Sequence, residues 1–320
     1  MAGLLLLSAL LLGGCAHRVP LAEERIAGLA PRVELVETPF FPQERYQCGP
    51  AALATMLNVR GVPITPEALV PQVYLPAREG SLQAEIIAAT RRQGLLAVTV
   101  EPELDALLAE VAAGHPVLVL QNLGLDWLPR WHYAVAIGYD LAEQELILRS
   151  GTEARRFTQF AVFMRTWDRS RRWGLVVLTP DALPARAVPL SYLDAVSGLE
   201  TVGKLDAARE GYRTASEKWP GEAVAWLGLG NVDHAEGRHA SAEAAFRRAI
   251  EARPDDFAAW NNLAHALAAR QCVDLARRSA RCAARLQPAS TEVGQTVQEM
   301  DALPLSTGES CAPLPACPTP

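Results

Sequence analysis

The carboxyl-terminal half of the chain repeats itself every 34 residues (254 − 220 = 34; 288 − 254 = 34), and this period limits the folds open to it. A proline, an aromatic residue and a small residue each recur at this step. They are Pro220, Pro254 and Pro288; Tyr192, Trp226 and Trp260; and Ala215, Ala249 and Ala283. No strand-like alternation interrupts them, so the region is expected to be helical throughout.

This unit, with an early aromatic residue, small residues midway and a closing proline, resembles the tetratricopeptide repeat (TPR) family. The segment Trp226-Leu227-Gly228-Leu229-Gly230 fits the first helix of such a repeat. Tyr212 and Phe246 fit the large position of the second helix, where Ala280 departs. The resemblance implies about three helical hairpins over residues 190–290, which stack because one hairpin cannot bury its apolar face alone. TPR arrays bind protein segments, so a protein partner is expected. An unrelated alanine-rich helical bundle is the alternative.

The first residues have the features of an export signal. The apolar run of residues 4–12 is too short to span a membrane and is followed by Leu12-Gly13-Gly14-Cys15. Small residues before a cysteine resemble the lipobox of bacterial lipoproteins. An ordinary cleaved signal followed by a chance cysteine is the alternative.

The lipobox resemblance implies that residues 1–14 are removed and that the thiol of Cys15 is acylated, with residues 15–38 as a lipidated tether. Ala16 follows the cysteine, which by the same resemblance favours the outer membrane, facing the periplasm. No later stretch is apolar over the ~20 residues that an internal membrane span requires.

Four further cysteines lie near the end of the chain, as suits an exported protein. If Cys272 and Cys282 lie on one helix, ten residues apart (282 − 272 = 10), they stand ~15 Å from each other, too far for a mutual bridge. Bridges to Cys311 and Cys317 would pin the Pro-rich tail, residues 291–320, onto the repeats, with the pairing left open. The spacings match no standard metal site, and no cofactor is expected.

Residues 39–180 have a different character. The chain of 320 residues is 50% hydrophobic, enough for about two domains with real cores, and its net charge of −6 argues against nucleic acid as a partner. Helices come first and antiparallel strands later, which is an α+β order, and the Pro- and Ala-rich residues 181–189 form a linker. The expected helices are 48–58, 82–93 (with Ser81 as its cap) and 102–112; the expected strands are 117–121, 132–139, 145–148 and 174–178.

Cys48 opens the first of these helices. A helix start carries partial positive charge and favours the thiolate, which is the nucleophilic form of cysteine. Gln43, five residues earlier (48 − 43 = 5), can donate to a developing oxyanion together with the Cys48 backbone N–H. Gln47 is an alternative donor, but because it directly precedes Cys48 in the chain its side chain is expected to point away from the oxyanion. The plain alternative is a cysteine buried in the core.

A base must come from elsewhere in the chain. His132 begins a predicted strand, whereas His115 sits in the turn Gly114-His115-Pro116, so the base is assigned to His132. The four tryptophans of this half are expected to serve hydrophobic packing rather than a carbohydrate platform. They are Trp127, Trp131, Trp167 and Trp173.

Gln43, then Cys48-Gly49-Pro50-Ala51-Ala52-Leu53, then His132-Tyr133-Ala134-Val135-Ala136-Ile137-Gly138-Tyr139-Asp140, resemble the papain-like, bacteriocin-processing cysteine peptidases. That family cleaves leader peptides after a double glycine within export transporters. The resemblance covers roughly residues 39–180 and implies a Cys–His site. No transporter is attached here, so leader processing does not carry over.

The chain departs from that family at the third catalytic residue, the one that orients the histidine. Its relatives place an Asp on the strand after the histidine, but residues 146–151 hold no carboxylate. Asp140 lies eight residues along a strand from His132 (140 − 132 = 8), ~26 Å away and out of reach. If the hairpin turns near Ala142, Ser150 returns opposite His132 and can orient its imidazole.

Two functions of different classes therefore remain. One is a cysteine peptidase, or a related acyl-transfer enzyme such as a transglutaminase or amidase, that acts on a peptide or protein. The other is a membrane-anchored scaffold whose peptidase fold and TPR units bind peptides without cutting them, which the missing Asp motivates.

Overall fold

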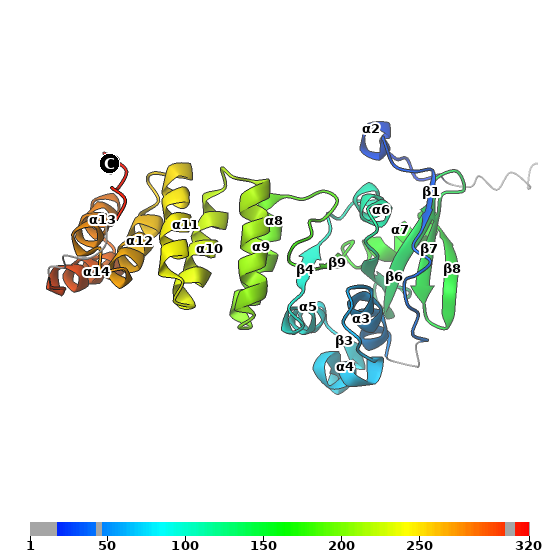
Figure 1. Cartoon of the computed structure of the whole chain (residues 1–320). Helices are drawn as coiled ribbons and strands as arrows, with labels where there is room; N and C mark the ends of the chain where they lie inside the picture. Colours follow the sequence, from blue (N-terminus) through cyan, green and yellow to red (C-terminus); the bar gives the residue numbers. More distant parts are fainter. Residues whose placement is uncertain (1–17, 43–46, 305–310, 320) are drawn as a thin grey trace, which may run out of the picture. The chain divides into compact units, whose positions relative to one another are not determined.

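The computed structural model describes residues 18–42, 47–304 and 311–319, and the chain divides into two compact units (Figure 1). The first unit is Met1–Ile86 with Thr99–Val176, and the second is Ile87–Val98 with Val177–Pro320. The first is a mixed helix–sheet unit, and the second is dominated by helices. The expected α+β domain followed by a helical repeat region is confirmed.

The elements up to the linker contain short helices and mostly antiparallel strands. Their bounds are α2 Glu23–Ile26, β1 Arg32–Glu34, α3 Cys48–Val59, α4 Pro66–Val73, β2 Tyr74–Leu75, the 3₁₀ turn Pro76–Arg78, β3 Gly80–Ser81, α5 Gln83–Arg92, β4 Leu96–Thr99, α6 Leu104–Ala112, β5 Val117–Asn122, β6 Trp131–Asp140, β7 Glu145–Ser150, β8 Glu153–Gln159, α7 Phe160–Asp168 and β9 Gly174–Leu178.

The main sheet has the order β4-β9-β5-β6-β7-β8 within the described part of the chain, and β1 pairs with β6 beside this path. Strands β5, β6, β7 and β8 form a continuous antiparallel meander. The β6–β7 turn is closed by the Asp140 carboxylate, which accepts from the Ala142 and Glu143 backbone N–H groups at 3.0 and 3.1 Å. The predicted hairpin near Ala142 is therefore confirmed.

Helix α3 is the central helix of this unit because its sequence is apolar on nearly every side. Leu53, Met56 and Leu57 are buried, and the helix packs against β5 and β6. Helices α6 and α7 also pack against these two strands or their neighbours. The end of the sheet where α3 begins is thereby held between buried apolar layers, which fixes the position of the first residue of α3.

Several sequence-based expectations differ from the structure. The third expected helix begins at Leu104 rather than at residue 102. Ser81 does not cap α5, because its buried hydroxyl has no hydrogen-bond partner among the described residues. Strands β1, β4 and β8 and helices α4 and α7 were not expected. Strand β8 reads EARRFTQ and is exposed on nearly every residue, so it has no apolar alternation by which to recognise it.

The repeat region consists of three helical hairpins and one further helix. Their bounds are α8 Pro189–Thr201 with α9 Leu205–Lys218, α10 Ala223–Ala235 with α11 His239–Ala252, α12 Phe257–Ala269 with α13 Val273–Leu286, and α14 Thr291–Ala302. Helix α14 occupies the first part of the segment expected to be a Pro-rich tail. Ser290 caps it, accepting from the Val293 N–H at 3.3 Å.

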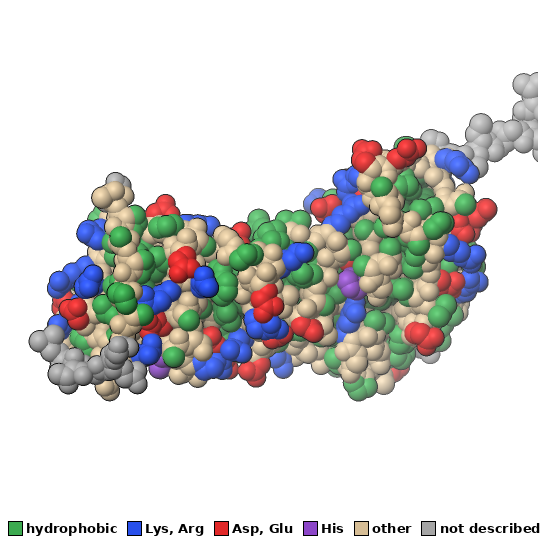
Figure 2. Space-filling view, turned by 45° about the horizontal axis from the view of Figure 1, so that its top comes forward, with side chains coloured by type: hydrophobic (Ala, Val, Ile, Leu, Met, Phe, Trp, Pro, Cys, Tyr) green, Lys and Arg blue, Asp and Glu red, His purple; other side chains and the backbone are tan. Residues whose placement is uncertain are grey.

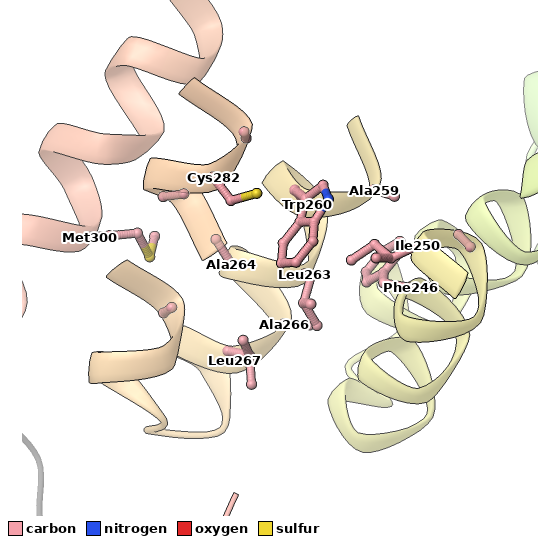
Figure 3. Close-up of a cluster of buried hydrophobic side chains, with 14 of the residues drawn as sticks. Phe246, Ile250, Ala259, Trp260, Leu263, Ala264, Ala266, Leu267, Cys282 and Met300 are labelled. Atoms are coloured by element: carbon pink, nitrogen blue, oxygen red, sulfur yellow. The ribbon is translucent and has the colours of Figure 1, made fainter. Parts of the chain in front are cut away.

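The 34-residue period has a visible physical basis. The indole N–H of Trp226 donates to the Pro220 carbonyl at 2.9 Å, and that of Trp260 donates to the Pro254 carbonyl at 2.8 Å. Each aromatic residue thus closes the turn that its own proline begins. Figure 3 shows Trp260 of α12 lying among Leu263, Ala264 and Phe246 in the shared core of neighbouring hairpins.

Glycines let the hairpins approach closely. A Cβ on Gly228 would lie 2.4 Å from the Tyr212 ring, and a Cβ on Gly230 would lie 2.5 Å from the Phe246 ring. Both rings are buried, so neither can retreat into solvent. Gly228 is therefore required by packing between successive hairpins, and Gly230 by packing of α10 against α11 within one hairpin.

Two disulfides hold the end of the chain to the repeats. Cys272 is bridged to Cys311 and Cys282 to Cys317, with Cα–Cα distances of 6.2 and 5.8 Å. Cys282 lies on α13 and Cys272 is the N-cap of that helix, and the expected bridging of both to the tail is confirmed, with the pairing settled. Arg247 of α11 adds a hydrogen bond of 2.8 Å from its guanidinium to the Pro313 carbonyl.

No helix of the described residues is long and apolar enough to cross a membrane. On the face shown in Figure 2, acidic and basic side chains are interspersed rather than gathered into one large area of a single sign. Ion pairs among the described residues include Arg155 with Glu34 and Arg209 with Asp233.

Candidate active site

Cys48 is the first residue of α3 and is half-buried. Its N-cap, Gln47, makes no side-chain hydrogen bond to the helix start, so no side chain there competes for the first N–H groups. The backbone N–H groups of Cys48 and Gly49 interact with the sulfur itself, as does the N–H of Tyr133 on β6. The thiol therefore lies between the start of α3 and the strand that carries His132.

Burial raises the pKa of the Cys48 thiol above its usual value, and the three N–H groups only partly offset this effect. The helix start does not by itself make Cys48 a thiolate, contrary to the simple expectation from its position. The desolvation of a buried anion is larger here than the stabilisation by nearby dipoles. A partner that removes the proton during reaction is therefore needed.

His132 lies on β6, one residue before Tyr133, and is half-buried. Its Nε2 atom is 2.8 Å from the hydroxyl of Ser150, which is buried near the end of β7. The predicted approach of Ser150 to His132 is thus found, but Ser150 is not directly opposite His132, because the pairing of Val135 with Arg149 places Ser150 diagonally across from it. Because Ser150 contacts Nε2, the ring nitrogen considered below for proton exchange with Cys48 is Nδ1.

Burial lowers the pKa of His132 to about 4, and the positive charge of Arg156 acts in the same direction. No carboxylate of the described residues offsets these effects, and the group beside Nε2 is the neutral hydroxyl of Ser150. At neutral pH the histidine is therefore uncharged and the cysteine is a thiol. This neutral pair differs from a preformed thiolate–imidazolium ion pair.

The wall of the site includes a contact that the sequence did not reveal. A Cβ on Gly49 would lie 2.3 Å from the Ser81 hydroxyl oxygen, so β3 lies directly against the start of α3. The Tyr133 hydroxyl donates to the Ser81 carbonyl at 3.3 Å, and the Tyr133 ring meets Trp173 edge-on at 5.9 Å. Glycine after the cysteine is thus a packing requirement as well as part of a motif.

The remaining candidates have other positions or roles. Gln43 and Cys15 lie outside the described residues, so their roles stay predictions. His115 Nδ1 pairs with Glu110 at 2.8 Å, and Asp140 closes the far turn of β6, which agrees with leaving both out of the site. Among the described residues no group of three or more His, Cys, Asp or Glu side chains is arranged to hold a metal ion.

The expectation that the tryptophans serve packing is correct for Trp167, which is buried, and wrong for two others. Trp127, on the loop after β5, is 78% exposed, and Trp131, the first residue of β6, is 54% exposed. Sequence reasoning missed this loop because apolar residues were assigned to the core by type alone.

The chain resembles known proteins in two separate segments. Residues 35–173 match the Peptidase_C39 like family, and residues 193–257 and 235–291 match the tetratricopeptide repeat family. Among curated proteins, Protein O-mannosyl-transferase TMTC1 of Homo sapiens is 40% identical over 60 residues, which are 19% of this chain and 7% of that protein. The chain thus spans only a small part of that relative's length.

Solved structures resemble each segment at low identity. A C39-like peptidase from Bacillus anthracis is 18% identical with a TM-score of 0.39, covering 47% of this chain and 98% of that one. The first TPR of Spaghetti (RPAP3), bound to the HSP90 peptide SRMEEVD, is 18% identical with a TM-score of 0.34, covering 35% of this chain and 90% of that one. The second TPR domain of human RPAP3, in complex with the HSP70 peptide SGPTIEEVD, is 16% identical with a TM-score of 0.35, covering 36% of this chain and 96% of that one.

The family matches agree with the elements that hold the site. Helix α3 and strands β5 to β7 all lie within residues 35–173, and helices α10 to α12 lie within residues 193–291. The chain therefore carries a Peptidase_C39-like domain followed by tetratricopeptide repeats.

Proposed function

We propose that the protein is a membrane-anchored cysteine peptidase that cleaves a peptide or protein through Cys48 and His132. One observation carries the proposal. The sulfur of a helix-opening cysteine interacts with the backbone N–H of Tyr133, the residue next to His132, and His132 is held by a buried serine. A nucleophile and a base on adjacent elements are the minimum that acyl transfer requires.

In the acylation step, Cys48 Sγ attacks the carbonyl carbon of the scissile amide while His132 takes the thiol proton. The negative charge moves to the carbonyl oxygen, where the Cys48 backbone N–H and the predicted donor Gln43 can stabilise it. As the C–N bond breaks, His132 returns the proton to the leaving amine, and a thioester to Cys48 remains. Water, deprotonated by His132, then attacks the thioester and releases the carboxylic acid and the thiol.

Ser150 has a positioning role in this scheme. For Nδ1 to accept the thiol proton, Nε2 must carry the ring hydrogen and donate it to the Ser150 hydroxyl. The 2.8 Å contact suits that hydrogen bond and fixes the plane of the ring. A neutral hydroxyl stabilises the imidazolium less than a carboxylate would, so we expect a slower enzyme than one with an aspartate at this place.

The alternative is a scaffold that binds peptides without cutting them. The pKa of His132, about 4, favours it, because so weak a base provides little driving force for proton transfer. The TPR region would then supply the main binding surface.

A cleavage assay distinguishes the two functions. The chain beginning after Cys15 is incubated with a mixed-sequence peptide library, and new termini are identified by mass spectrometry. The peptidase proposal expects cleavage by the wild type, none by Cys48→Ala, and a loss of about 10²–10⁴-fold for His132→Ala. Equal peptide binding by the wild type and Cys48→Ala, without cleavage by either, would establish the scaffold.

The location in the cell envelope is part of the same proposal. Acylation of Cys15 would anchor the chain to the outer membrane, facing the periplasm. The two disulfides support an oxidising compartment. Fractionation of cells that express the wild type or Cys15→Ser tests the anchor, since only the wild type is expected in the membrane fraction. The TPR units would bind the substrate or a protein partner.

A further inference from the structure

The loop between β5 and β6 exposes large apolar side chains. Residues 123–131, which are this loop and Trp131 at the start of β6, are here named the apolar loop and hold five of the large hydrophobic residues that are exposed in the described chain. They are Leu123, Leu125, Trp127, Leu128 and Trp131. Apolar surface gathered in this way usually marks a contact site, whereas single exposed apolar residues need no explanation.

The backbone of the apolar loop is held in place by the buried side chain of Asn122 and the more exposed side chain of Arg169. The buried side chain of Asn122 accepts from the Gly124 N–H at 2.9 Å and from the Arg130 N–H at 2.8 Å. Arg169 donates to the Gly124 carbonyl at 2.7 Å. These bonds fix the loop without burying its apolar side chains, so the surface is preformed and binding need not order it.

The apolar loop leads directly into the proposed active site. Trp131 is followed by His132, and the next backbone N–H, that of Tyr133, interacts with the Cys48 sulfur. Two residues of extended chain span only ~7 Å. A peptide whose carbonyl reaches Cys48 therefore has neighbouring side chains within reach of the indole of Trp131.

Two features disfavour a bilayer as the occupant. Asp126 stands between Leu125 and Trp127 with its side chain 84% exposed and 3.7 Å from Arg169, so this pair offers no net positive charge to an anionic membrane surface. The chain that leads back to Cys15 lies at the other end of β6, where the Val19 N–H donates to Gln144 at 2.9 Å. That end is nine residues from Trp131 (140 − 131 = 9), ~30 Å along the strand.

We infer that the apolar loop is a substrate subsite, which selects an extended peptide with a large apolar side chain beside the scissile bond. The inference rests on the proposed function, because it assumes that Cys48 is the nucleophile. Trp131 and Trp127 are then specificity-determining residues: they receive the substrate side chain and take no part in proton transfer.

Peptidyl chloromethyl ketones test this assignment. Two probes are used that differ only in the residue next to the reactive group, leucine or glutamate, and each Cys48 alkylation rate is divided by the iodoacetamide rate of the same variant. The wild type is expected to prefer the leucyl probe about 10–200-fold. The Trp127→Ser/Trp131→Ser variant is expected to lose most of that preference, while Val162→Ser, at an apolar position on α7 that is 44% exposed, keeps it.

Each outcome has a definite meaning. A wild type that reacts with both probes equally overturns the subsite, and so does a preference that survives in the double tryptophan variant. A wild type whose Cys48 reacts with iodoacetamide no faster than His132→Gln overturns the proposed function instead. If the chain from residue 18 onward binds phosphatidylglycerol vesicles, and Trp127→Ser/Trp131→Ser abolishes this binding, the apolar loop is a membrane-binding surface and the peptide subsite is overturned.

Discussion

The pH dependence of Cys48 alkylation is the prediction that follows most directly from the geometry of the site. With the pKa of His132 at about 4, the imidazole remains a free base throughout the range from pH 5 to pH 7. Iodoacetamide should then react with Cys48 through general-base assistance, at a rate that follows the neutral imidazole. That rate is expected to fall only ~10% between pH 7 and pH 5.

Other states of the pair give different slopes. A histidine with an ordinary pKa of ~6.5 would lose ~25-fold over the same two pH units, because most of it becomes protonated. A thiol that reacts only as its own thiolate would lose ~100-fold, since its pKa lies above the whole range. His132→Gln is expected to show this last, steepest slope, and Ser150→Ala should weaken the assistance without restoring an ordinary histidine pKa.

The assay is the second-order rate of Cys48 labelling, followed by intact mass across the pH range, with the thiolate ultraviolet absorbance recorded in parallel. The wild type minus Cys48→Ala difference spectrum should show no thiolate at pH 7, because burial raises the pKa of the thiol. A level rate accompanied by thiolate absorbance would mean a preformed ion pair and would refute the neutral-pair reasoning. If the wild-type rate has the same pH dependence as that of His132→Gln, His132 does not assist the reaction of Cys48.

Three predictions concern stability. The pKa of His132 is ~6.5 in the unfolded chain and about 4 in the folded one, so folding favours the neutral imidazole. The contribution of His132 to the unfolding free energy should be complete above pH 6.5 and should fall by up to about 3 kcal/mol as the pH drops to 4. Measurement of the unfolding free energy across this pH range should show a smaller loss in His132→Gln. Gly228→Ala should lower the unfolding free energy by about 1–3 kcal/mol, because the new methyl group meets the Tyr212 ring, whereas Gly294→Ala on α14 has open space and should be stabilising by up to about 1 kcal/mol; an equal effect of the two in thermal unfolding would show that helix propensity alone decides. Cys282→Ser removes one bridge to the tail and should lower stability by about 2–4 kcal/mol under oxidising conditions, with no difference from the wild type once both are reduced.

The parts of the fold that could be predicted from the sequence are those with a repeated or local cause. The 34-residue period can be recognised in the sequence because Trp226 and Trp260 each donate a hydrogen bond to the carbonyl of the proline six residues earlier, so the same contact recurs at the same step. The helix opened by Cys48 is readable because Pro50 suits a first turn. The hairpin after Asp140 could be placed because a polar segment interrupts two apolar strands.

The parts that could not be predicted depend on contacts between distant segments. Strand β8 is defined by its pairing with β7 and not by its own exposed side chains. The contact of Ser81 with Gly49 and the neutral state of the Cys48–His132 pair both arise from burial, which no local pattern shows. The contact between Ser150 and His132 was within reach of the sequence because strand length and turn position together fix which side chains meet.

A covalent intermediate on Cys48 would show that this cysteine is the nucleophile. The chain is mixed with a peptide that it cleaves, quenched in acid during turnover and digested, and the fragment that contains Cys48 is weighed. We expect an added mass equal to the acyl part of the peptide, attached to Cys48 as a thioester and removed by hydroxylamine. Cleavage that proceeds undiminished in Cys48→Ala, with no such adduct on the wild type, would contradict it.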